Sequence, residues 1–461
     1  MKPHILLIYS DQHRYDCMAH TGHPLVRTPN LDQLSREGVS FTHAFTPSPI
    51  CVPARCSLLS GQWPSQHGVI FNYDGETFKP LDNTIPTCSS LLQAAGYHTV
   101  HVGRWHVDPH RGPHFFGFHD YIPEWHYKKW RAAQGIPPVP PHDWFGADDP
   151  HISPDQSPPA WGARQVLRWF DIACELNEPL FIHWHTTEPH LPCVPPAELS
   201  KLYVPSSIPP WPGFTDPCHH KPLIQRQMRH TWQVHNLSWH DWAPTVARYL
   251  ATITCLDHAI GIVLHGLRAR GLDDNTLVIY SADHGDMCGN HGMIDKHYVM
   301  YDDVIRVPLI LRWPAALPAG TVRNAFVSNA LDLAATFCDA AGLPLPASFA
   351  GQSLLPLARG DASAQPRQDI FASYAGNQFG AFSQRMVRDY RWKYVWNPVA
   401  QDELYDLASD PAELHNRVTD PSCASELARL QTRLLWWMEH THDRLLNHWT
   451  RLQLSGHRIH T

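Results

Sequence analysis

The sequence lacks three features that would assign it to common classes of protein. No basic run is longer than a few residues and the formal net charge is −7, so nothing points to a nucleic-acid partner. No apolar run approaches the roughly 20 residues that a membrane helix needs, so no membrane partner is expected. The 11 cysteines include no C-x-x-C pair, which favours reduced thiols over a disulfide framework.

The beginning of the chain also lacks a signal-like segment. Residues 1–4 lead directly into a short apolar run at residues 5–9, without an apolar region of signal length or a small-residue cleavage site. We therefore expect a cytoplasmic protein, unless a leading segment has been removed.

Three residue types are abundant instead: the 461 residues include 34 His, 18 Trp and 42 Pro. Proline predicts long irregular connections, and we expect them at residues 108–159 and 191–222. Histidine and tryptophan suggest a polar, aromatic-lined site or an interface, although scatter over the surface is the alternative. The hydrophobic fraction of 43% is that of an ordinary globular chain with one large domain or two.

Short apolar runs alternate with helical patterns over most of the chain, which predicts an α/β fold with a large, mostly parallel sheet flanked by helices. The predicted strands are residues 5–9, 39–45, 98–102, 180–184, 276–280 and 307–311. The predicted helices are residues 28–38, 53–61, 87–95, 161–176, 243–270 and 329–341.

The pattern changes near residue 369. Residues 370–374, 380–387 and 393–397 are typical of short antiparallel strands, and residues 422–440 of a helix. This predicts a catalytic α/β domain at residues 1–368 and a smaller α+β subdomain at residues 369–461. The tail at residues 445–461 is either an oligomer contact or frayed.

One stretch carries the strongest chemical signal: Cys51-Val-Pro-Ala-Arg-Cys-Ser-Leu-Leu-Ser-Gly61. Pro53 suits the first turn of a helix and Gly61 its C-terminal cap, so Cys51 is expected at a helix N-terminus, which favours an anion. Arg55, one turn later, could offer a forked cationic partner to a tetrahedral oxyanion. A buried cysteine beside a surface arginine is the alternative.

The C-x-P-x-R pattern followed by Ser-Leu-Leu-Ser-Gly-Gln resembles the signature of the type I sulfatases, and the resemblance runs from residue 5 to about residue 415. In that family the cysteine is converted to Cα-formylglycine by a formylglycine-generating enzyme. The resemblance implies an alkaline-phosphatase-like α/β fold and hydrolysis of a sulfate ester, of a small molecule or a saccharide, through a nucleophile at position 51.

Two further pairs of polar residues follow predicted strands: Asp11-Gln12 and Asp283-His284. Hard oxygen ligands with one imidazole suit Ca²⁺, Mg²⁺ or Mn²⁺, whereas capping of a following turn is the alternative for either aspartate alone. The resemblance implies that these four residues and position 51 hold one divalent ion. Ca²⁺ is expected first, and Gln12 leaves the identity of the metal open because it brings no negative charge.

The resemblance also nominates residues that surround the sulfate: Arg55, Arg104, His106, His190 and Lys296. Arg104 stands where the family usually has lysine and is expected to bind substrate, because it is a poor proton donor. The leaving-group acid is then His190 or Lys296, and His106 is a plausible base. Asn72 matches a substrate-facing asparagine, although a turn residue is as good an interpretation.

Two alternatives remain open at this point. A phosphonate monoester or phosphodiester hydrolase of the same superfamily would share this residue set, since both chemistries move a tetrahedral oxyanion. A non-catalytic metal- or anion-binding protein is the remote one. The aromatic segments at residues 114–130 and 211–242 could stack on a sugar or aryl group, or form the interface of a homo-oligomer.

Overall fold

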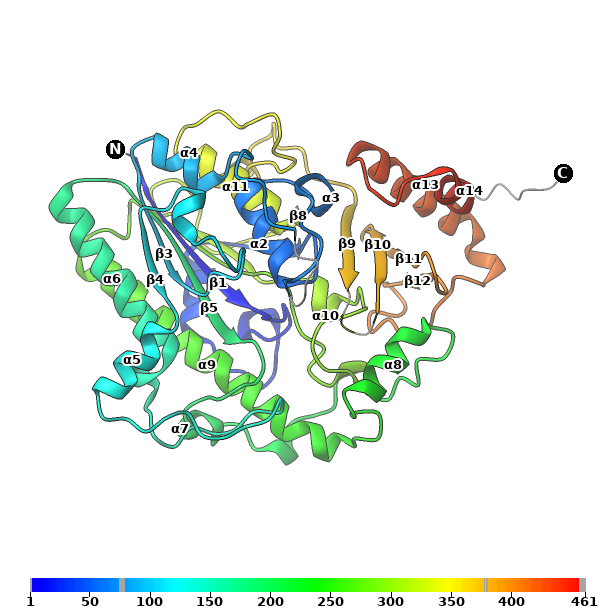
Figure 1. Ribbon diagram of the computed structural model, residues 1–461, viewed down its shortest axis with the longest axis horizontal. Coiled ribbons are helices and arrows are strands. Elements are labelled where there is room, and N and C mark those ends of the chain that lie inside the picture. Colours follow the sequence, from blue (N-terminus) through cyan, green and yellow to red (C-terminus); the bar gives the residue numbers. More distant parts are fainter. Residues whose placement is uncertain (1, 74–78, 377, 379, 456–461) are drawn as a thin grey trace.

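The computed structural model describes residues 2–73, 79–376, 378 and 380–455. Its strands form an eight-stranded sheet in the order β4-β3-β5-β1-β6-β7-β2-β8 and a four-stranded sheet in the order β12-β11-β10-β9 (Figure 1). The strands are β1 His4–Asp11, β2 Val39–Phe45, β3 His98–Gly103, β4 Asp120–Pro123, β5 Leu180–Pro189, β6 Thr276–Ala282, β7 Leu309–Arg312, β8 Thr321–Ser328, β9 Ile370–Gly376, β10 Phe382–Arg388, β11 Trp392–Trp396 and β12 Glu403–Asp406.

The helices are α1 Pro29–Glu37, α2 Cys51–Ser60, α3 Pro64–His67, α4 Cys88–Ala94, α5 His126–Ala133, α6 Pro158–Leu176, α7 Ala197–Ser200, α8 Leu223–Thr231, α9 Trp239–Ala269, α10 Asp302–Ile305, α11 Asn329–Ala340, α12 Leu355–Arg359, α13 Ala424–His440 and α14 His448–Ser455. The predicted α/β class with a mixed, mostly parallel sheet is confirmed. Only β7 runs against its neighbours among the paired strands of the large sheet, since it is antiparallel to both β6 and β2.

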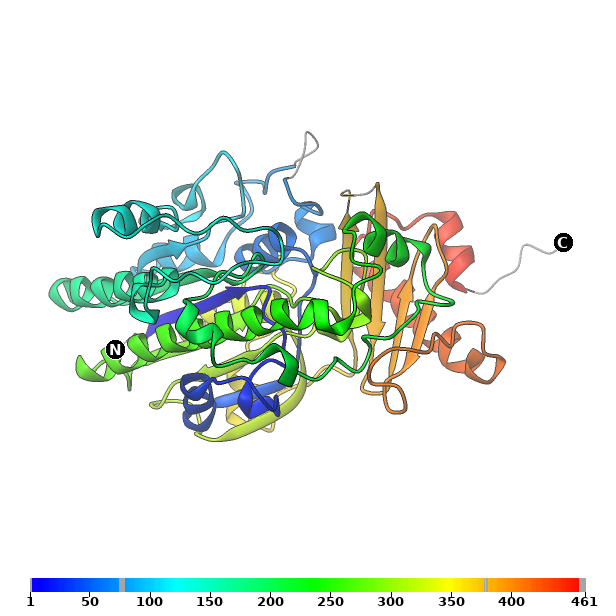
Figure 2. The same cartoon turned by 90° about the horizontal axis from the view of Figure 1, so that it is seen from below.

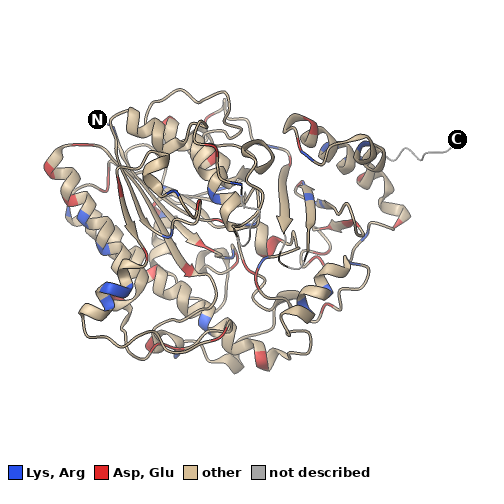
Figure 3. Cartoon of the chain, viewed as in Figure 1, with Lys and Arg blue, Asp and Glu red and all other residues tan. Residues whose placement is uncertain are grey.

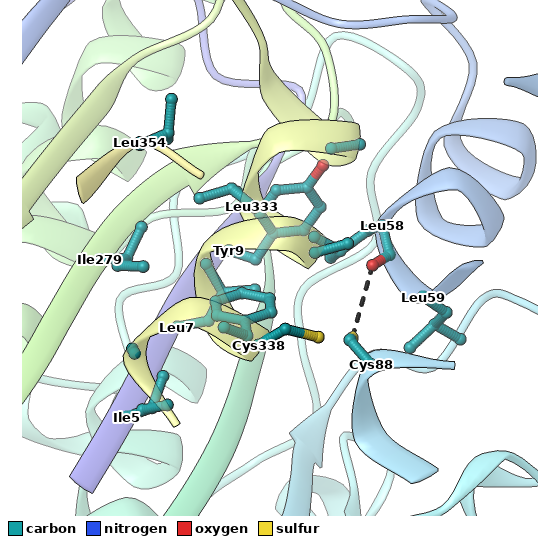
Figure 4. Packing of buried hydrophobic residues seen from close by; sticks show 14 of the residues in the cluster. Ile5, Leu7, Tyr9, Leu58, Leu59, Cys88, Ile279, Leu333, Cys338 and Leu354 are labelled. Carbon is teal, nitrogen blue, oxygen red and sulfur yellow. Dashed lines mark hydrogen bonds between the residues drawn. The ribbon is translucent and has the colours of Figure 1, made fainter. Parts of the chain in front are cut away.

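Strand β1 lies at the centre of the large sheet, parallel to β5 on one side and β6 on the other. Its side chains alternate between two apolar cores. Ile5, Leu7 and Tyr9 pack with α2, α4 and α11 on one face, as Figure 4 shows for Leu58 of α2 and Leu333 of α11. Leu6 and Ile8 pack with α6 and α9 on the other. Burial on both faces explains the uninterrupted apolar run.

One prediction of irregular chain needs correction, and one strand was missed. Residues 108–159 contain β4, which extends the large sheet beside β3, and the helix α5. Strand β8, which pairs with β2, was not predicted either. Both are edge strands with alternating or partly exposed side chains, so neither has the continuous apolar run that marks the inner strands.

The helix predicted at residues 243–270 begins earlier, at Trp239, and most of its side chains are buried. An 18-residue window of this helix has a mean hydropathy of 1.5, so by length and composition alone it could cross a membrane, contrary to the expectation that no apolar run is long enough. However, 78% of that window is buried inside the protein. Figure 2 shows α9 running alongside the large sheet, which accounts for its apolar composition.

The C-terminal part forms the predicted antiparallel sheet, with one additional strand, β12, and α13 packed against it. Its strands share an apolar cluster with the rest of the chain, which includes Phe45, Ile305, Ile370 and Met386. The boundary at residue 368 remains a prediction, and part of the predicted tail, residues 456–461, lies outside the described residues. Figure 3 shows Lys and Arg interspersed with Asp and Glu along the chain.

Candidate active site

Four of the predicted metal ligands meet at the carboxyl ends of the central strands. Asp11 ends β1, Asp283 and His284 follow the neighbouring strand β6, and Cys51 is the first residue of α2. One ligand atom from each lies within 4.8 Å of the others, and all four side chains are fully buried. Because β1 and β6 are parallel with Ser10 opposite Ala282, the two aspartates emerge side by side.

The orientation of His284 suits a ligand. Its Nδ1 lies 2.9 Å from the carbonyl oxygen of Gly285, so Nδ1 carries the proton and donates it. The free Nε2 faces Cys51 Sγ at 3.2 Å and Asp283 Oδ1 at 3.6 Å. Burial lowers the pKa of this imidazole, which keeps it neutral as metal binding requires. Two carboxylates and a neutral imidazole fit a divalent cation.

Gln12 lies beside this set, but its side-chain amide is already engaged. Its oxygen accepts a hydrogen bond from Lys296 Nζ at 2.8 Å, and its nitrogen donates to Asp286 and Asp295. Its backbone N–H donates to Asp283 Oδ1 at 3.1 Å. Gln12 therefore links the ligand set to Lys296, and its role as a ligand stays a prediction.

Arg55 lies between the two aspartates. Its Nη2 contacts Asp11 Oδ2 at 2.8 Å, and its Nε and Nη2 contact Asp283 Oδ2 at 3.0 Å. Its Nη1 lies 3.3 Å from the carbonyl oxygen of Arg104 and 2.9 Å from Nδ1 of His185. Protein groups thus engage all three guanidinium nitrogens. We expected the guanidinium of Arg55 to be open to a tetrahedral oxyanion. The structure shows it paired with the carboxylates of Asp11 and Asp283 instead.

Asp11 is ionised although it is buried. Burial alone would raise its pKa, but the charges of Arg104 and Arg55 hold it well below the usual range. Arg104 contributes through Nη1 at 3.0 Å from Asp11 Oδ2, and its side chain is 17% exposed whereas that of Arg55 is fully buried. Arg104 is therefore the arginine that a substrate can reach.

Lys296 and His190 form a direct pair. Lys296 Nζ lies 2.9 Å from His190 Nε2, and His190 Nδ1 donates to the carbonyl oxygen of Leu191. The Nε2 lone pair therefore accepts from the ammonium group. Burial, then Lys296, lowers the pKa of His190 to about 3, whereas Asp295 raises the pKa of Lys296 against the effect of burial. The proton of the pair rests on Lys296.

His106 lies near Arg104, and Asn72 lies beside the first turn of α2. His106 lies edge-on to Tyr73, with ring centroids 5.0 Å apart, and its buried Nδ1 has no hydrogen-bond partner among the described residues. Burial, then Arg104, lowers its pKa well below the usual value. Asn72 accepts the backbone N–H of Val52 at 3.0 Å, so it caps the first turn of α2, which is closer to the turn interpretation than to substrate contact.

Some groups around the site were not predicted. His101, His183 and His185 form a buried cluster behind Arg55. The His-x-His spacing at residues 183 and 185 was a signal that both rings lie on one face, although the predicted strand ended at residue 184 and the observed strand β5 extends to Pro189. Asp286 and Asp295, which hold Gln12, come from loops without regular structure, and no spacing in the sequence indicates that contact.

The fold and the site together define an enzyme of the alkaline phosphatase superfamily. A family model described as Sulfatase matches residues 3–343, and one described as N-sulphoglucosamine sulphohydrolase, C-terminal, matches residues 289–440. The chain belongs to the sulfatase family.

Similar proteins cover nearly the whole chain. An arylsulfatase of Clostridium perfringens is 29% identical over 469 residues, which cover 95% of each chain. An N-acetylglucosamine-6-O-sulfatase of Bacteroides thetaiotaomicron is 25% identical, over 95% of this chain and 86% of the relative. The crystal structure of a phosphonate monoester hydrolase of Agrobacterium radiobacter has a TM-score of 0.85 and 26% identity, over 95% of this chain and 96% of the other.

Proposed function

We propose that the protein hydrolyses sulfate esters of a small molecule or saccharide, with formylglycine made from Cys51 as the nucleophile. The observation that carries this is the position of Cys51 Sγ, 3.2 Å from His284 Nε2 and 3.8 Å from Asp11 Oδ1, at the point where the ligand set and the cationic side chains meet. Membership of the sulfatase family argues against the alternative of a non-catalytic metal- or anion-binding protein.

The unmodified thiol is poorly suited to the reaction. Burial, then Asp11, raises the pKa of Cys51 to about 12, so the thiolate nucleophile is scarce at neutral pH. The hydrated aldehyde of formylglycine would supply one hydroxyl to attack sulfur and a second whose deprotonation expels sulfate and restores the aldehyde. A formylglycine-generating enzyme is therefore a necessary partner of this proposal.

A divalent cation would be held by Asp11, Asp283, His284 and the side chain at position 51, with Gln12 as a further candidate. When bound, it would acidify a hydroxyl at position 51 and offset the charge of the sulfate. Ca²⁺ is the first choice because the donors are mainly hard oxygens, and Mn²⁺ or Mg²⁺ are alternatives.

The other side chains have separate roles in this proposal. Arg104, partly exposed beside Asp11, binds the sulfate oxygens. Lys296 carries the proton for the leaving alcohol and delivers it directly or through His190 Nε2, 2.9 Å away. His106 is neutral, and its Nδ1 has no partner in the part of the chain that the structure describes, so it accepts the proton of the second hydroxyl.

A phosphonate monoester or phosphodiester hydrolase is the second candidate, because the Agrobacterium radiobacter phosphonate monoester hydrolase superposes with a TM-score of 0.85. The same side chains could bind a phosphonate, since both chemistries move a tetrahedral oxyanion.

Parallel measurements decide between them. The chain is produced together with a formylglycine-generating enzyme, and kcat/KM is measured on an aryl sulfate and an aryl phosphonate monoester. Mass spectrometry of the peptide that contains Cys51 establishes the modification, and Cys56→Ala on the same helix is the matched control. We expect an aldehyde at position 51, faster sulfate hydrolysis and no activity in Cys51→Ala. An active preparation with an intact thiol would refute the mechanism, and preference for the phosphonate would favour the second candidate.

A further inference from the structure

Three histidines lie behind the active site on neighbouring strands. His101 is on β3, and His183 and His185 are on β5, where alternate residues face the same side of the sheet. All three are buried, and burial lowers their pKa values, that of His101 to about 3. Their rings contact one another, with His183 and His185 stacked at 5.2 Å.

Of these three histidines, His185 is the one that hydrogen-bonds Arg55. Its Nδ1 lies 2.9 Å from Arg55 Nη1, and because a guanidinium has no acceptor, Nδ1 must accept and Nε2 must carry the ring proton. His101 bonds the other acceptor of Arg55 Nη1, the carbonyl oxygen of Arg104. Its Nε2 lies 3.1 Å from the carbonyl oxygen of Arg104, which also accepts from Arg55 Nη1.

We propose that His185 is a positioning residue for the reaction: its neutral Nδ1 fixes the guanidinium of Arg55, which in turn orients the carboxylates of Asp11 and Asp283. Without this acceptor, Nη1 would keep only the longer contact to Arg104 O at 3.3 Å, and the guanidinium could rotate away from the aspartates. The proposal rests on the proposed function only for its kinetic readout.

The chemistry of this position explains why an imidazole serves here. A third carboxylate would compete with Asp11 and Asp283 for the same guanidinium and draw it backwards, whereas a neutral acceptor adds one hydrogen bond without a competing charge. An apolar side chain would leave a buried N–H donor of a charged group without its partner, which is costly.

The same tautomer argues against assigning the three histidines to a second metal ion, although one nitrogen from each lies within 4.8 Å of the others. His185 Nε2 carries a proton and cannot ligate while Nδ1 accepts from Arg55. A dication there would also lie beside the buried cation Arg55 and be repelled by it. The carboxylates next to Arg55, Asp11 and Asp283, belong to the active-site ligand set and are not available to a second ion.

His183 provides a matched control. It lies on the same strand and the same face, it is equally buried, and neither of its ring nitrogens has a hydrogen-bond partner among the described residues. The test compares three variants: His185→Phe, which removes the acceptor; His185→Asn, whose amide oxygen can take the place of Nδ1; and His183→Phe. Each is assayed for kcat and KM on whichever aryl ester the wild type hydrolyses, and for Mn²⁺ affinity by calorimetry.

We expect His185→Phe to lower kcat at least tenfold with a smaller effect on KM, and to weaken Mn²⁺ binding at least fivefold. His185→Asn should recover both values to within about threefold, and His183→Phe should leave both near those of the wild type. Equal losses in His185→Phe and His183→Phe, or no recovery in His185→Asn, would overturn the proposal. If the wild type hydrolyses neither ester, the proposed function fails, while Mn²⁺ affinity still decides the role of His185.

Discussion

At the scale of single residues, the site depends on one guanidinium. Arg55 pairs with two buried carboxylates that would otherwise repel each other, and it also contacts the backbone of Arg104 and the ring of His185. Removing one partner of a buried ionic network costs about 3–5 kcal/mol in other proteins, because it leaves charge uncompensated. The motif arginine is therefore as much a structural residue as a functional one.

The ligand set predicts a defined response to metal removal. Treatment with EDTA should abolish hydrolysis, and Ca²⁺, or otherwise Mn²⁺ or Mg²⁺, should restore it. Asp283→Asn should weaken metal binding at least tenfold, because a carboxylate facing His284 Nε2 is replaced by an amide. The control is Asp257→Asn, which changes another buried aspartate that accepts the backbone N–H of Leu31 at α1. Full activity in metal-free enzyme would contradict the proposed site.

His67 gives a pH-dependent test of stability. Its Nδ1 accepts the N–H of Val69, its Nε2 faces Ser57 Oγ, and burial lowers its pKa to about 3. The unfolded chain, with a histidine pKa near 6.5, therefore binds more protons between about pH 3 and 6.5, and stability falls as the pH drops through this window.

We accordingly expect His67→Asn to be less stable than the wild type at pH 7. Its deficit should shrink by about 1.4 kcal/mol for each pH unit below about 6.5, because the variant no longer excludes a proton. Urea unfolding at pH 7.5, 6.5 and 5.5 measures the difference. A deficit for His67→Asn that stays constant over these three pH values would refute the explanation.

At the scale of elements, the end of β3 holds the site together through a close contact. Gly103 has φ +96°, and a Cβ placed there would lie 1.9 Å from the carbonyl oxygen of His185. The backbone N–H of Arg104 donates to that same oxygen at 2.9 Å. Any side chain at this position would therefore push β5, with His185, away from β3.

Gly103, the last residue of β3, and Gly96, two residues before β3 begins, allow a matched comparison. Gly103→Ala should destabilise the protein by at least about 3 kcal/mol and lower activity, since it adds a steric clash to an unfavourable φ. Gly96→Ala, with φ +84° and open space around its Cβ, should cost only about 1–2 kcal/mol and leave activity unchanged. Unfolding curves and kcat/KM measure both, and similar effects from the two variants would argue against the close contact.

The sequence predicted the inner elements well because local patterns determine them. Val39–Phe45 was predicted with the bounds that the structure shows, and Gly61 ends α2 in a left-handed conformation as expected. The edge strands β4 and β8 were missed because their partners, not their apolar runs, make them strands. The contacts of Gln12 with Lys296 and of Arg55 with His185 join residues more than a hundred positions apart, which no local pattern specifies.

At the scale of the whole molecule, the two sheets are not independent. Lys393 on β11 is buried and reaches Asp302 at 2.6 Å and Glu413 at 2.7 Å, and Arg388 on β10 also binds Asp302. The second family model, over residues 289–440, likewise extends across the boundary predicted at residue 368. Packing and charge therefore couple the C-terminal sheet to the catalytic part.

A truncated chain tests this coupling. We expect residues 1–368 expressed alone to be insoluble or unfolded, because they would expose the apolar cluster around Phe45 and leave Asp302 without its cations. A chain that ends at residue 447 keeps the Arg385–Asp443 pair and should fold, with lower stability. Circular dichroism and thermal unfolding measure both. A cooperative, active 1–368 fragment would show that the predicted boundary separates independent domains.

The burial of α2 has a consequence for the order of events in the cell. All ten residues from Cys51 to Ser60 are buried in the folded protein, so a second protein could not bind this segment after folding. If position 51 is oxidised as we propose, the oxidising enzyme has to reach it on a nascent or still extended polypeptide. Each chain then has one opportunity to mature, and a chain that folds first remains inactive permanently.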